Sequence, residues 1–240
     1  MRNKQSPEKR QFREDEQLFV HSIFTTIQGE GPFTGHRAVF IRLAGCNLQC
    51  PACDTEYTNS RMLTDPETLL AAVQNKLPSG TLVVITGGEP LRQDVTKLCW
   101  LLVDAGYFVQ IETNGTLPPP SALFSHLCST DLDGRRCVFV VCSPKTGSVN
   151  KDLLKHISAY KYVLSHDETD NDGLPVLALG HSAAPRVARP HEGFSGPVYL
   201  QPQDSEELLT NNLHLEAVKA SCMEHGYILQ LQVHKIIHME

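Results

Sequence analysis

Short apolar runs alternate along this chain with amphipathic runs of helical period. The apolar runs are bounded by Gly, Pro and charged positions, which is the pattern of buried strands. They predict strands at 18–27, 38–44, 81–86, 107–112, 137–142, 162–165, 198–201 and 227–237. The amphipathic runs predict helices at 64–73, 94–105, 151–160 and 205–224. Thr64-Asp65-Pro66-Glu67 gives the first helix a capping pair and a proline in its first turn.

Strand–helix alternation of this kind predicts parallel strands joined by crossover helices. About six such units are present, fewer than the eight of a closed TIM barrel. We therefore predict an α/β fold, a partial and open (βα)6 TIM-like barrel. A single domain over 17–240 follows a flexible tail at 1–16. Two polar excursions, at about 117–136 and 166–196, are rich in Pro, Gly and charge and predict surface loops or a lid.

Composition narrows the class of protein. The 240 residues carry a net charge of -6 and no basic run, which argues against a nucleic-acid partner. No apolar stretch reaches the roughly 18 residues of a transmembrane helix, and 1–16 lacks the apolar core of a secretory signal. Of eight cysteines, three are crowded into one short segment and the rest lie in apolar patterns, as in a reducing compartment. We predict a cytoplasmic enzyme without a membrane partner.

The crowded cysteines are Cys46, Cys50 and Cys53, at a C-x3-C-x2-C spacing directly after the strand at 38–44. A structural zinc site wants four ligands, and most electron-transfer iron–sulfur clusters use four thiolates. Three thiolates can hold three corners of a [4Fe–4S] cubane and leave the fourth iron open to a small molecule. The alternatives are redox-active thiols, or a zinc site completed by a distant histidine such as His21 or His36.

Polar motifs also follow the other predicted strands, at the ends where parallel barrels collect their chemistry. They are Thr86-Gly87-Gly88-Glu89-Pro90, Glu112-Thr113-Asn114-Gly115, Ser143-Pro144-Lys145 and Gln201-Pro202-Gln203-Asp204. Each one alone is compatible with an ordinary turn. Their convergence on successive strand ends favours a single site.

The cysteine spacing together with Gly-Gly-Glu-Pro resembles the radical S-adenosylmethionine (radical SAM) superfamily. Further segments resemble, in the same order, the family of 7-carboxy-7-deazaguanine synthases. These segments are 27–31 (Ile-Gln-Gly-Glu-Gly), 40–48 (Phe-Ile-Arg-Leu-Ala-Gly-Cys-Asn-Leu), 53–55 (Cys-Asp-Thr), 112–115 and 232–235 (Gln-Val-His-Lys). The resemblance runs from about Phe19 to the end of the chain.

This resemblance implies a radical ring contraction of 6-carboxy-5,6,7,8-tetrahydropterin to 7-carboxy-7-deazaguanine and ammonia, in queuosine biosynthesis. It implies a [4Fe–4S] cluster, S-adenosylmethionine (SAM) and Mg²⁺ as cofactors. A flavodoxin or ferredoxin type of electron donor and a homodimer are the partners that it implies. No catalytic acid or base is assigned beyond the cluster.

The resemblance also implies the residues that bind each group. It implies that the three cysteines bind the cluster and that Thr55 binds Mg²⁺. The residues that it implies for SAM are Ala52, Asp54, Gly87, Gly88, Glu89, Ser143, Pro144, Lys145, Gln201, Pro202, Gln203 and Asp204. Those that it implies for the pterin are Ile27, Gln28, Gly29, Glu30, Arg42, Thr86, His234 and the terminal Glu240.

Two of these residues carry a physical argument of their own. Arg42 interrupts an apolar strand, and a buried charge is costly unless it is paired. A bidentate bond to the substrate carboxylate would pair it, and so would an internal salt bridge with Glu30 or Glu112. His234 is either a donor to the substrate or an ordinary histidine on the last strand.

Three other functions stay open at this point. Another small radical SAM enzyme, such as a glycyl-radical activase, would act on a protein surface. A non-catalytic zinc-binding module would contain zinc in place of iron. A homologue of the deazapurine pathway without the activity would keep the fold and fail to turn over the pterin.

Overall fold

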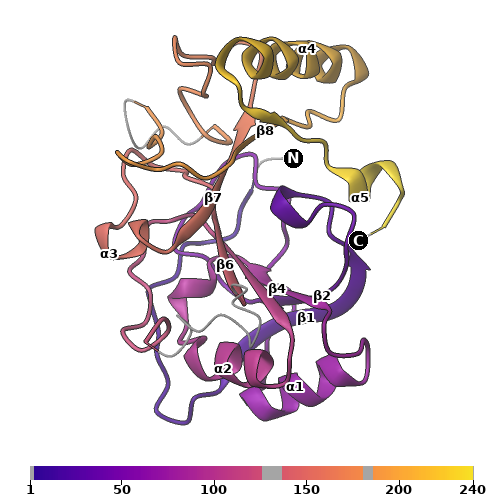
Figure 1. Cartoon of the computed structure of the whole chain (residues 1–240), viewed down its shortest axis with the longest axis vertical. Coiled ribbons are helices and arrows are strands. Elements are labelled where there is room, and N and C mark those ends of the chain that lie inside the picture. Colours follow the sequence, from indigo (N-terminus) through magenta and orange to yellow (C-terminus); the bar gives the residue numbers. More distant parts are fainter. Residues whose placement is uncertain (1–2, 126–136, 181–185, 240) are drawn as a thin grey trace.

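The computed structural model describes residues 3–125, 137–180 and 186–239. Its centre is one open, nine-stranded sheet in the order β3-β1-β2-β4-β5-β6-β7-β8-β9 (Figure 1). The strands are β1 (Leu18–Ile27), β2 (Arg37–Leu43), β3 (Met62–Thr64), β4 (Leu82–Gly87), β5 (Phe108–Thr113), β6 (Val138–Cys142), β7 (Ile157–Leu164), β8 (Val198–Pro202) and β9 (Ile228–Leu229).

From β2 to β9 every neighbouring pair of strands is parallel, whereas β1 pairs antiparallel with both β2 and β3. The predicted α/β class is therefore confirmed as a mixed α/β fold with an open sheet. Because the carboxyl ends of parallel strands share one edge, the segments that follow β2, β4, β5, β6 and β8 come together there. This edge carries the site.

The helices are α1 (Pro66–Gln74), α2 (Thr96–Asp104), α3 (Lys151–Leu154), α4 (Leu208–His225) and α5 (Val233–Ile236), with 3-10 turns η1 (Gly31–Phe33) and η2 (Pro90–Arg92). The predicted helix start is confirmed, but the residue that caps α1 is Asp65 and not Thr64 of the predicted capping pair: Asp65 accepts a bond of 2.7 Å from the Thr68 amide. Gly226 ends α4 in the left-handed region, at a φ of 77°. Helices α1 and α2 pack side by side, far from α4 in Figure 1.

Two predicted elements are wrong in their extent. The helix predicted at 151–160 ends at Leu154, and Ile157–Leu164 forms β7 between β6 and β8. This segment is a strand because it pairs with a neighbouring strand on each side, and its alternating aromatic residues favour that conformation. The strand predicted at 227–237 is only Ile228–Leu229, followed by α5. The strand Met62–Thr64 was not predicted.

The core lies between the sheet and its helices. Val39, Ile41, Val83, Ile85 and Val109 are fully buried, as expected for strands covered on both faces. In the described residues, no helix is long and apolar enough to cross a membrane.

The predicted N-terminal tail and the second predicted excursion both make defined contacts in the structure. Residues 3–16 contain no helix or strand, and Asn3, Gln5 and Glu8 bond the loop between β2 and β3. In the second excursion Arg189 bonds Asp170 at 2.9 Å and Asp172 at 2.7 Å. Part of each excursion, 126–136 and 181–185, lies outside the described residues.

Candidate active site

The loop between β2 and β3 carries the three cysteines. Cys46 and Cys50 are buried and Cys53 is half-buried. The Leu48 amide donates to Cys46 Sγ at 3.4 Å, and Cys53 Sγ lies 3.8 Å from the Thr55 carbonyl oxygen. Burial, together with the charges of Glu89, Cys50 and Cys53, raises the pKa of Cys46 to about 12, although the bond from the Leu48 amide opposes this. In their thiolate forms, three cysteines in one largely buried loop would need compensating positive charge, which iron would supply.

The spacing of these thiols bears on the kind of metal site. In the part of the chain that the structure describes, no three His, Cys, Asp or Glu side chains come together tightly enough to hold one metal ion. A cubane cluster binds each thiolate at a different iron, so its ligands stand further apart than those of a single zinc ion. The absence of such a group among the described residues is therefore compatible with a cluster at Cys46, Cys50 and Cys53.

The turn after β4 lies directly on the cysteine loop. A Cβ on Gly88 would be 2.1 Å from the carbonyl oxygen of Gly45, and one on Gly87 would be 2.1 Å from that of Leu43. The Gly88 and Glu89 amides donate to these same two carbonyls, Gly88 to Leu43 at 3.2 Å and Glu89 to Gly45 at 3.1 Å. The two glycines are therefore required by this close backbone approach.

Glu89, the acid of this turn, is fully buried. Its carboxylate accepts from the Thr113 hydroxyl at 2.7 Å, the Asn114 amide at 2.8 Å and the Leu91 amide at 3.0 Å. Burial raises its pKa, and these bonds oppose that rise. A carboxylate accepts about four hydrogen bonds, so one position remains for a ligand.

Asn114 connects Glu89 to the cysteine loop. Its side chain donates to Asn47 Oδ1 at 3.0 Å, and Asn47 in turn donates to the Thr116 hydroxyl at 2.8 Å. Asn47 directly follows Cys46. The motif after β5 thus links Glu89, in the turn after β4, to the cysteine loop.

Lys145 lies beyond the end of β6. Its Nζ donates to the carbonyl oxygen of Ser143 at 3.1 Å and also to the Ser143 hydroxyl. Burial lowers the pKa of Lys145, and the charges of Cys50 and Cys53 counteract this. The ammonium therefore lies within electrostatic range of the cysteine loop, and the structure brings the Gly-Gly-Glu-Pro, Ser-Pro-Lys and cysteine motifs together.

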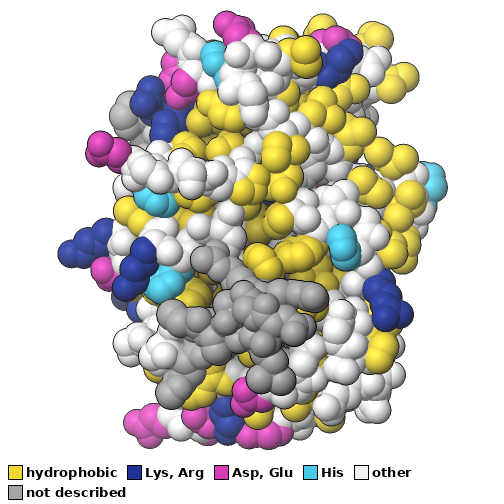
Figure 2. Space-filling view, in the orientation of Figure 1, with side chains coloured by type: hydrophobic (Ala, Val, Ile, Leu, Met, Phe, Trp, Pro, Cys, Tyr) yellow, Lys and Arg dark blue, Asp and Glu magenta, His cyan; other side chains and the backbone are white. Residues whose placement is uncertain are grey.

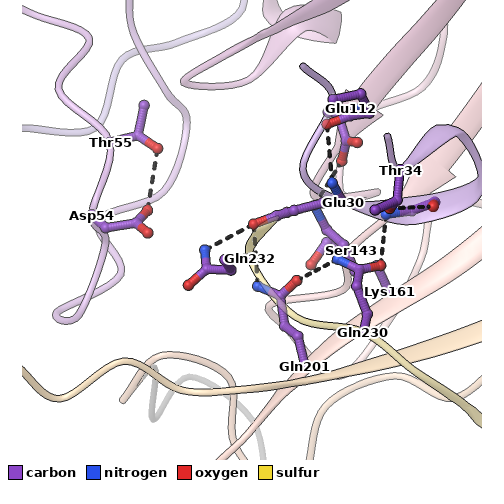
Figure 3. A network of polar contacts seen from close by, with 12 residues as sticks. Glu30, Thr34, Asp54, Thr55, Glu112, Ser143, Lys161, Gln201, Gln230 and Gln232 are labelled. Atoms are coloured by element: carbon purple, nitrogen blue, oxygen red, sulfur yellow. Dashed lines mark hydrogen bonds and ion pairs between the residues drawn. The ribbon is translucent and has the colours of Figure 1, made fainter. Parts of the chain in front are cut away.

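A second cluster of polar side chains joins β5, β7 and β8 to the segments that follow β1 and β9 (Figure 3). We call Glu30, Glu112, Lys161, Gln201 and Gln232 the glutamate–lysine network. Lys161, on β7, bonds Glu112 at 3.0 Å and also bonds Glu30. Gln232 donates to Glu30 at 2.8 Å and Gln201 approaches it at 3.5 Å. Gln230 completes the arrangement by donating to Gln201 at 2.8 Å.

One cation in this network serves two carboxylates. Burial opposes ionisation of Glu30, but Lys161 and Gln232 hold its pKa down at about 2. Burial also disfavours the charged form of Lys161, but Glu112 and Glu30 raise its pKa above the ordinary value. The network carries a net negative charge at neutral pH and suits a ligand that presents N–H donors.

The predicted pterin residues border this network. The Glu30 amide donates to the Gln28 side chain at 3.1 Å, and a Cβ on Gly29 would meet His234 Nδ1 at 2.1 Å. His234 lies in α5, so its predicted place on a last strand is wrong. Burial lowers its pKa, and Glu30 opposes this. Ile27, at the end of β1, directly precedes Gln28.

Arg42 and Thr86 are partners in the parallel ladder of β2 and β4. The Arg42 guanidinium lies over the Phe24 ring, 5.1 Å from its centroid. The two glutamates weighed as its internal partners both bond Lys161. Arg42 and Thr86 therefore lie side by side near the carboxyl ends of β2 and β4.

The remaining predicted residues lie around the cysteine loop. Thr55 donates to Asp54 Oδ1 at 3.3 Å, and Lys235 bridges Asp54, at 3.5 Å, to Asp204, at 2.9 Å. The Ala52 amide donates to the carbonyl oxygen of Leu179 at 3.1 Å. Pro144 is buried beside Ser143, Pro202 ends β8, and the Gln203 amide donates to the carbonyl oxygen of Leu164 at 3.0 Å. The predicted Glu240 lies outside the described residues.

The sequence analysis missed Lys161 as a site residue. The available signal was a lysine within an apolar strand, the same signal that singled out Arg42. The helix predicted at 151–160 concealed the strand character of this segment. Gln230 and Gln232 were missed because 227–237 was interpreted as one continuous strand.

Comparisons with known proteins bear on this site. No family model matches the chain. It is 41% identical over 230 residues to the 7-carboxy-7-deazaguanine synthase of Rhodospirillum rubrum, covering 92% of each chain. It is 38% identical to that of Rickettsia prowazekii, covering 93% of this chain and 89% of the relative. Its fold resembles the crystal structure of QueE from Escherichia coli, with a TM-score of 0.60, 24% identity and coverage of 90% and 93%.

A parallel α/β sheet with a C-x3-C-x2-C loop packed on a Gly-Gly-Glu-Pro turn defines the class, that of the radical SAM enzymes. Within that class, the chain belongs to the 7-carboxy-7-deazaguanine synthase family.

Proposed function

We propose that this chain converts 6-carboxy-5,6,7,8-tetrahydropterin to 7-carboxy-7-deazaguanine and ammonia, on the route to queuosine. The observation that carries the proposal is that residues 232–235 contact two polar sites, since Gln232 bonds Glu30 and Lys235 pairs with Asp54 of the cysteine loop. Buried thiols lie beside Glu89 and Lys145, and a carboxylate-rich network lies next to them. The first suits a cluster with its SAM, and the second suits a substrate rich in N–H groups.

The cluster ligands in this proposal are Cys46, Cys50 and Cys53. When bound, the [4Fe–4S] cluster and SAM supply the radical that takes hydrogen from C6 of the pterin. Glu89, with its remaining acceptor position and the backbone of Gly87 and Gly88, holds the amino group of SAM. Ser143, Pro144 and Lys145 hold its carboxylate, since a lysine beside a hydroxyl suits an anion. Ala52, Asp54, Gln201, Pro202, Gln203 and Asp204 complete the SAM site.

The pterin lies in this proposal over the glutamate–lysine network. Arg42 and Thr86 bind its carboxylate, because a guanidinium forms two parallel bonds with a carboxylate. Gln28, with the backbone of Ile27 and Gly29, bonds the amide edge, and Glu30 accepts from the amino groups. His234 and the terminal Glu240 add contacts. Glu112 joins them, since Lys161 ties it to Glu30. These residues orient the substrate and exclude water; none is proposed as an acid or base.

We propose further that the sheet curls into a partial, TIM-like (βα)6 barrel. Glu30 lies between β1 and η1, and its partners Lys161 and Gln201 belong to β7 and β8. Strands β1 and β7 are separated by four others in the sheet order, so contacts between them require strong curvature. One domain over 17–240 is part of this proposal.

The cofactor and partner proposals are Mg²⁺ at Thr55, a flavodoxin or ferredoxin type of electron donor, a homodimer and a cytoplasmic location. Mg²⁺ prefers hard oxygen ligands, and the Thr55 hydroxyl with Asp54 provides them. Exposed apolar side chains over α4 and α5 support a homodimer (Figure 2). They include Leu208, Leu209, Leu213, Met223, Ile236 and Ile237.

The test is anaerobic turnover of reconstituted protein with dithionite, SAM, Mg²⁺ and the pterin, followed by mass spectrometry. Cys50→Ala is the variant. Its matched control is Cys99→Ala, which removes a buried thiol from α2, away from the site. We expect product from the wild type and the control and none from Cys50→Ala. SAM cleavage without pterin turnover would favour another radical SAM enzyme, and a colourless zinc protein would contradict the class.

A further inference from the structure

Residues 3–11 lie along the cysteine loop and bond its main chain at several points. Asn3, Gln5 and Glu8 provide the contacts. The Asn3 amide donates to the carbonyl oxygen of Pro51 at 2.9 Å, Asn3 Nδ2 to that of Cys50 at 3.2 Å, Gln5 Nε2 to that of Thr55 at 2.9 Å and the Glu8 amide to that of Cys46 at 2.7 Å. Gln5 Oε1 accepts in return from the Tyr57 amide at 2.9 Å.

These bonds matter because residues 45–58 form no helix or strand. The carbonyl groups of a loop without helix or strand hydrogen bonds must accept bonds from side chains, water or another segment. Here two of the four bonded carbonyls belong to Cys46 and Cys50 themselves. The main chain that carries these thiols is therefore positioned from outside the loop.

The same segment also reaches the turn after β4. Arg92, in η2, is almost completely buried, and it donates to the carbonyl oxygens of Ala44 at 2.9 Å and Lys9 at 3.1 Å. Glu8 lies 3.3 Å from this guanidinium and also pairs with Arg61. The Gln11 amide donates back to the Arg92 carbonyl oxygen at 2.8 Å. Residues 3–11 thus connect the cysteine loop to the segment that follows Glu89.

We propose that residues 3–11 are a clamp that holds the cysteine loop in its cluster-binding conformation, with Asn3, Gln5 and Glu8 as positioning residues. The inference rests on the proposed function, since it concerns the loop that binds the cluster. Coupling between two events is reciprocal, so the bound cluster also orders the clamp. Loss of a clamp contact frees the loop to open, and the cluster then leaves faster.

A purely structural role for this segment makes a different prediction. It would lower the stability of the apoprotein and leave the rate of cluster release from folded protein unchanged. The two readouts are therefore measured separately. Gln5→Ala removes two loop contacts without disturbing any charge, whereas Glu8→Ala also removes a partner of the buried Arg92. Lys4→Ala is the matched control, because its side chain is exposed on the same segment.

The experiment follows iron release from reconstituted protein to a chelator, through loss of the visible cluster absorbance. Two lost hydrogen bonds predict release about tenfold faster from Gln5→Ala than from Lys4→Ala. Urea unfolding of each apoprotein sets the conditions at which all variants are equally folded. Equal release rates from Gln5→Ala, Glu8→Ala and Lys4→Ala would overturn the clamp.

Hydrogen exchange gives a second readout that needs no variant. We expect the Glu8 amide, which donates to the Cys46 carbonyl oxygen, to exchange more slowly in the cluster-loaded protein than in the apoprotein. Equal exchange in both forms would contradict the proposed coupling. A wild-type protein that takes up no iron–sulfur cluster would overturn the proposed function and the clamp together. A cluster-loaded wild type whose variants release iron at the control rate would overturn the clamp alone.

Discussion

The cysteine loop and the glutamate–lysine network are both contacted by residues 232–235 but are positioned in opposite ways. The loop is positioned through its main chain: by glycine contacts from the turn after β4, and by bonds from residues 3–11 to its carbonyls. The network is positioned through side chains that project from strands and from the segments after β1 and β9, and these side chains bond one another.

This difference teaches which substitutions each region tolerates. A site positioned through its main chain is sensitive to added volume where two backbones meet and indifferent to many side chains. A site positioned by charged side chains is sensitive to the loss of one charge, because a buried partner is then left uncompensated. Four substitutions test this contrast: Gly88→Ala and Lys161→Met have the larger expected effects, and Gln232→Ala and Lys235→Ala have the smaller ones.

Gly88→Ala tests the main-chain region most severely. Its Cβ would lie 2.1 Å from the carbonyl oxygen of Gly45, so the turn after β4 and the cysteine loop have to separate. We expect iron content after reconstitution and turnover to fall by about a hundredfold, since overpacking against backbone costs roughly 1–3 kcal/mol or more. Iron analysis and visible absorbance measure this.

The control for Gly88→Ala is Gly80→Ala, at a position with a φ of 78° and no atom within 4 Å of the added Cβ. It carries the backbone strain of a non-glycine residue but no collision. We expect nearly normal iron content from it. A Gly88→Ala protein with full iron content would show that the two backbones do not need to meet.

Lys161→Met tests the side-chain region. It leaves Glu30 and Glu112 buried together without their cation, and removing one partner of a buried ion pair costs about 3–5 kcal/mol. Urea unfolding at neutral pH measures the loss. Lys219→Met is the control, because Lys219 pairs with Glu216 at the surface, where such a pair contributes about 0–1 kcal/mol.

The pH dependence of stability also tests how Lys161 compensates the charge of Glu30. In the wild type the pKa of Glu30 is lowered from 4.5 to about 2, so its contribution is present above pH 4.5 and is lost as the pH falls to about 2. Without Lys161, burial dominates and raises the pKa of Glu30. The variant is then expected to gain stability on acidification from neutral pH, whereas the wild type does not. Parallel curves for the two proteins would contradict the role of Lys161.

The sequence predicted the motifs of both regions better than their partners. Cys46 and Glu89 could be found because short local motifs carry them, and the strands that precede them are strongly apolar. Lys161 could not be found in this way, because it lies 131 residues from Glu30 and between the helix predicted at 151–160 and the strand predicted at 162–165. Parallel pairing on both sides, which made this segment a strand, is a tertiary effect that local pattern does not contain.

The main-chain contacts were the hardest to predict. The Glu8 amide donates to the Cys46 carbonyl oxygen, and almost any residue has an amide to donate. Polar composition at 1–16 therefore predicted a flexible tail. In the part of it that the structure describes, Asn3, Gln5 and Glu8 bond the cysteine loop. The glutamines after β9 had a weak signal, since Gln230 and Gln232 alternate with apolar residues and so share one side of the chain.

Gln232→Ala sharpens the comparison without removing a charge. It removes the 2.8 Å bond to Glu30, and one hydrogen bond to a charged group contributes about 1.5–3 kcal/mol. We expect KM for the pterin to rise about tenfold, with iron content unchanged. Steady-state kinetics and iron analysis on the same sample measure both. A loss of iron would mean that the two regions are not separable at this residue.

Lys235→Ala gives the smallest expected effect and tests the contact between the two regions. Lys235 follows the pterin candidate His234 and bridges Asp54, in the cysteine loop, to Asp204 after β8. Its bonds, with those of the Glu206 amide and Asn211, lower the pKa of Asp204 to about 2. Solvent reaches these side chains, so the expected loss of stability is only about 0.5 kcal/mol. That loss is present above the ordinary pKa of Asp, 3.8, and disappears as the pH falls toward 2.

The kinetic consequence of Lys235→Ala separates two arrangements of the site. If the bridge only joins surface groups, the KM for SAM and for the pterin stays at the wild-type value. If it sets the distance between the cysteine loop and the end of β8, the KM for SAM rises a few-fold while that for the pterin does not, because Asp54 and Asp204 are both proposed to border SAM. Lys219→Ala is the matched control, and we expect the second result. A rise confined to the pterin would place the bridge with the glutamate–lysine network.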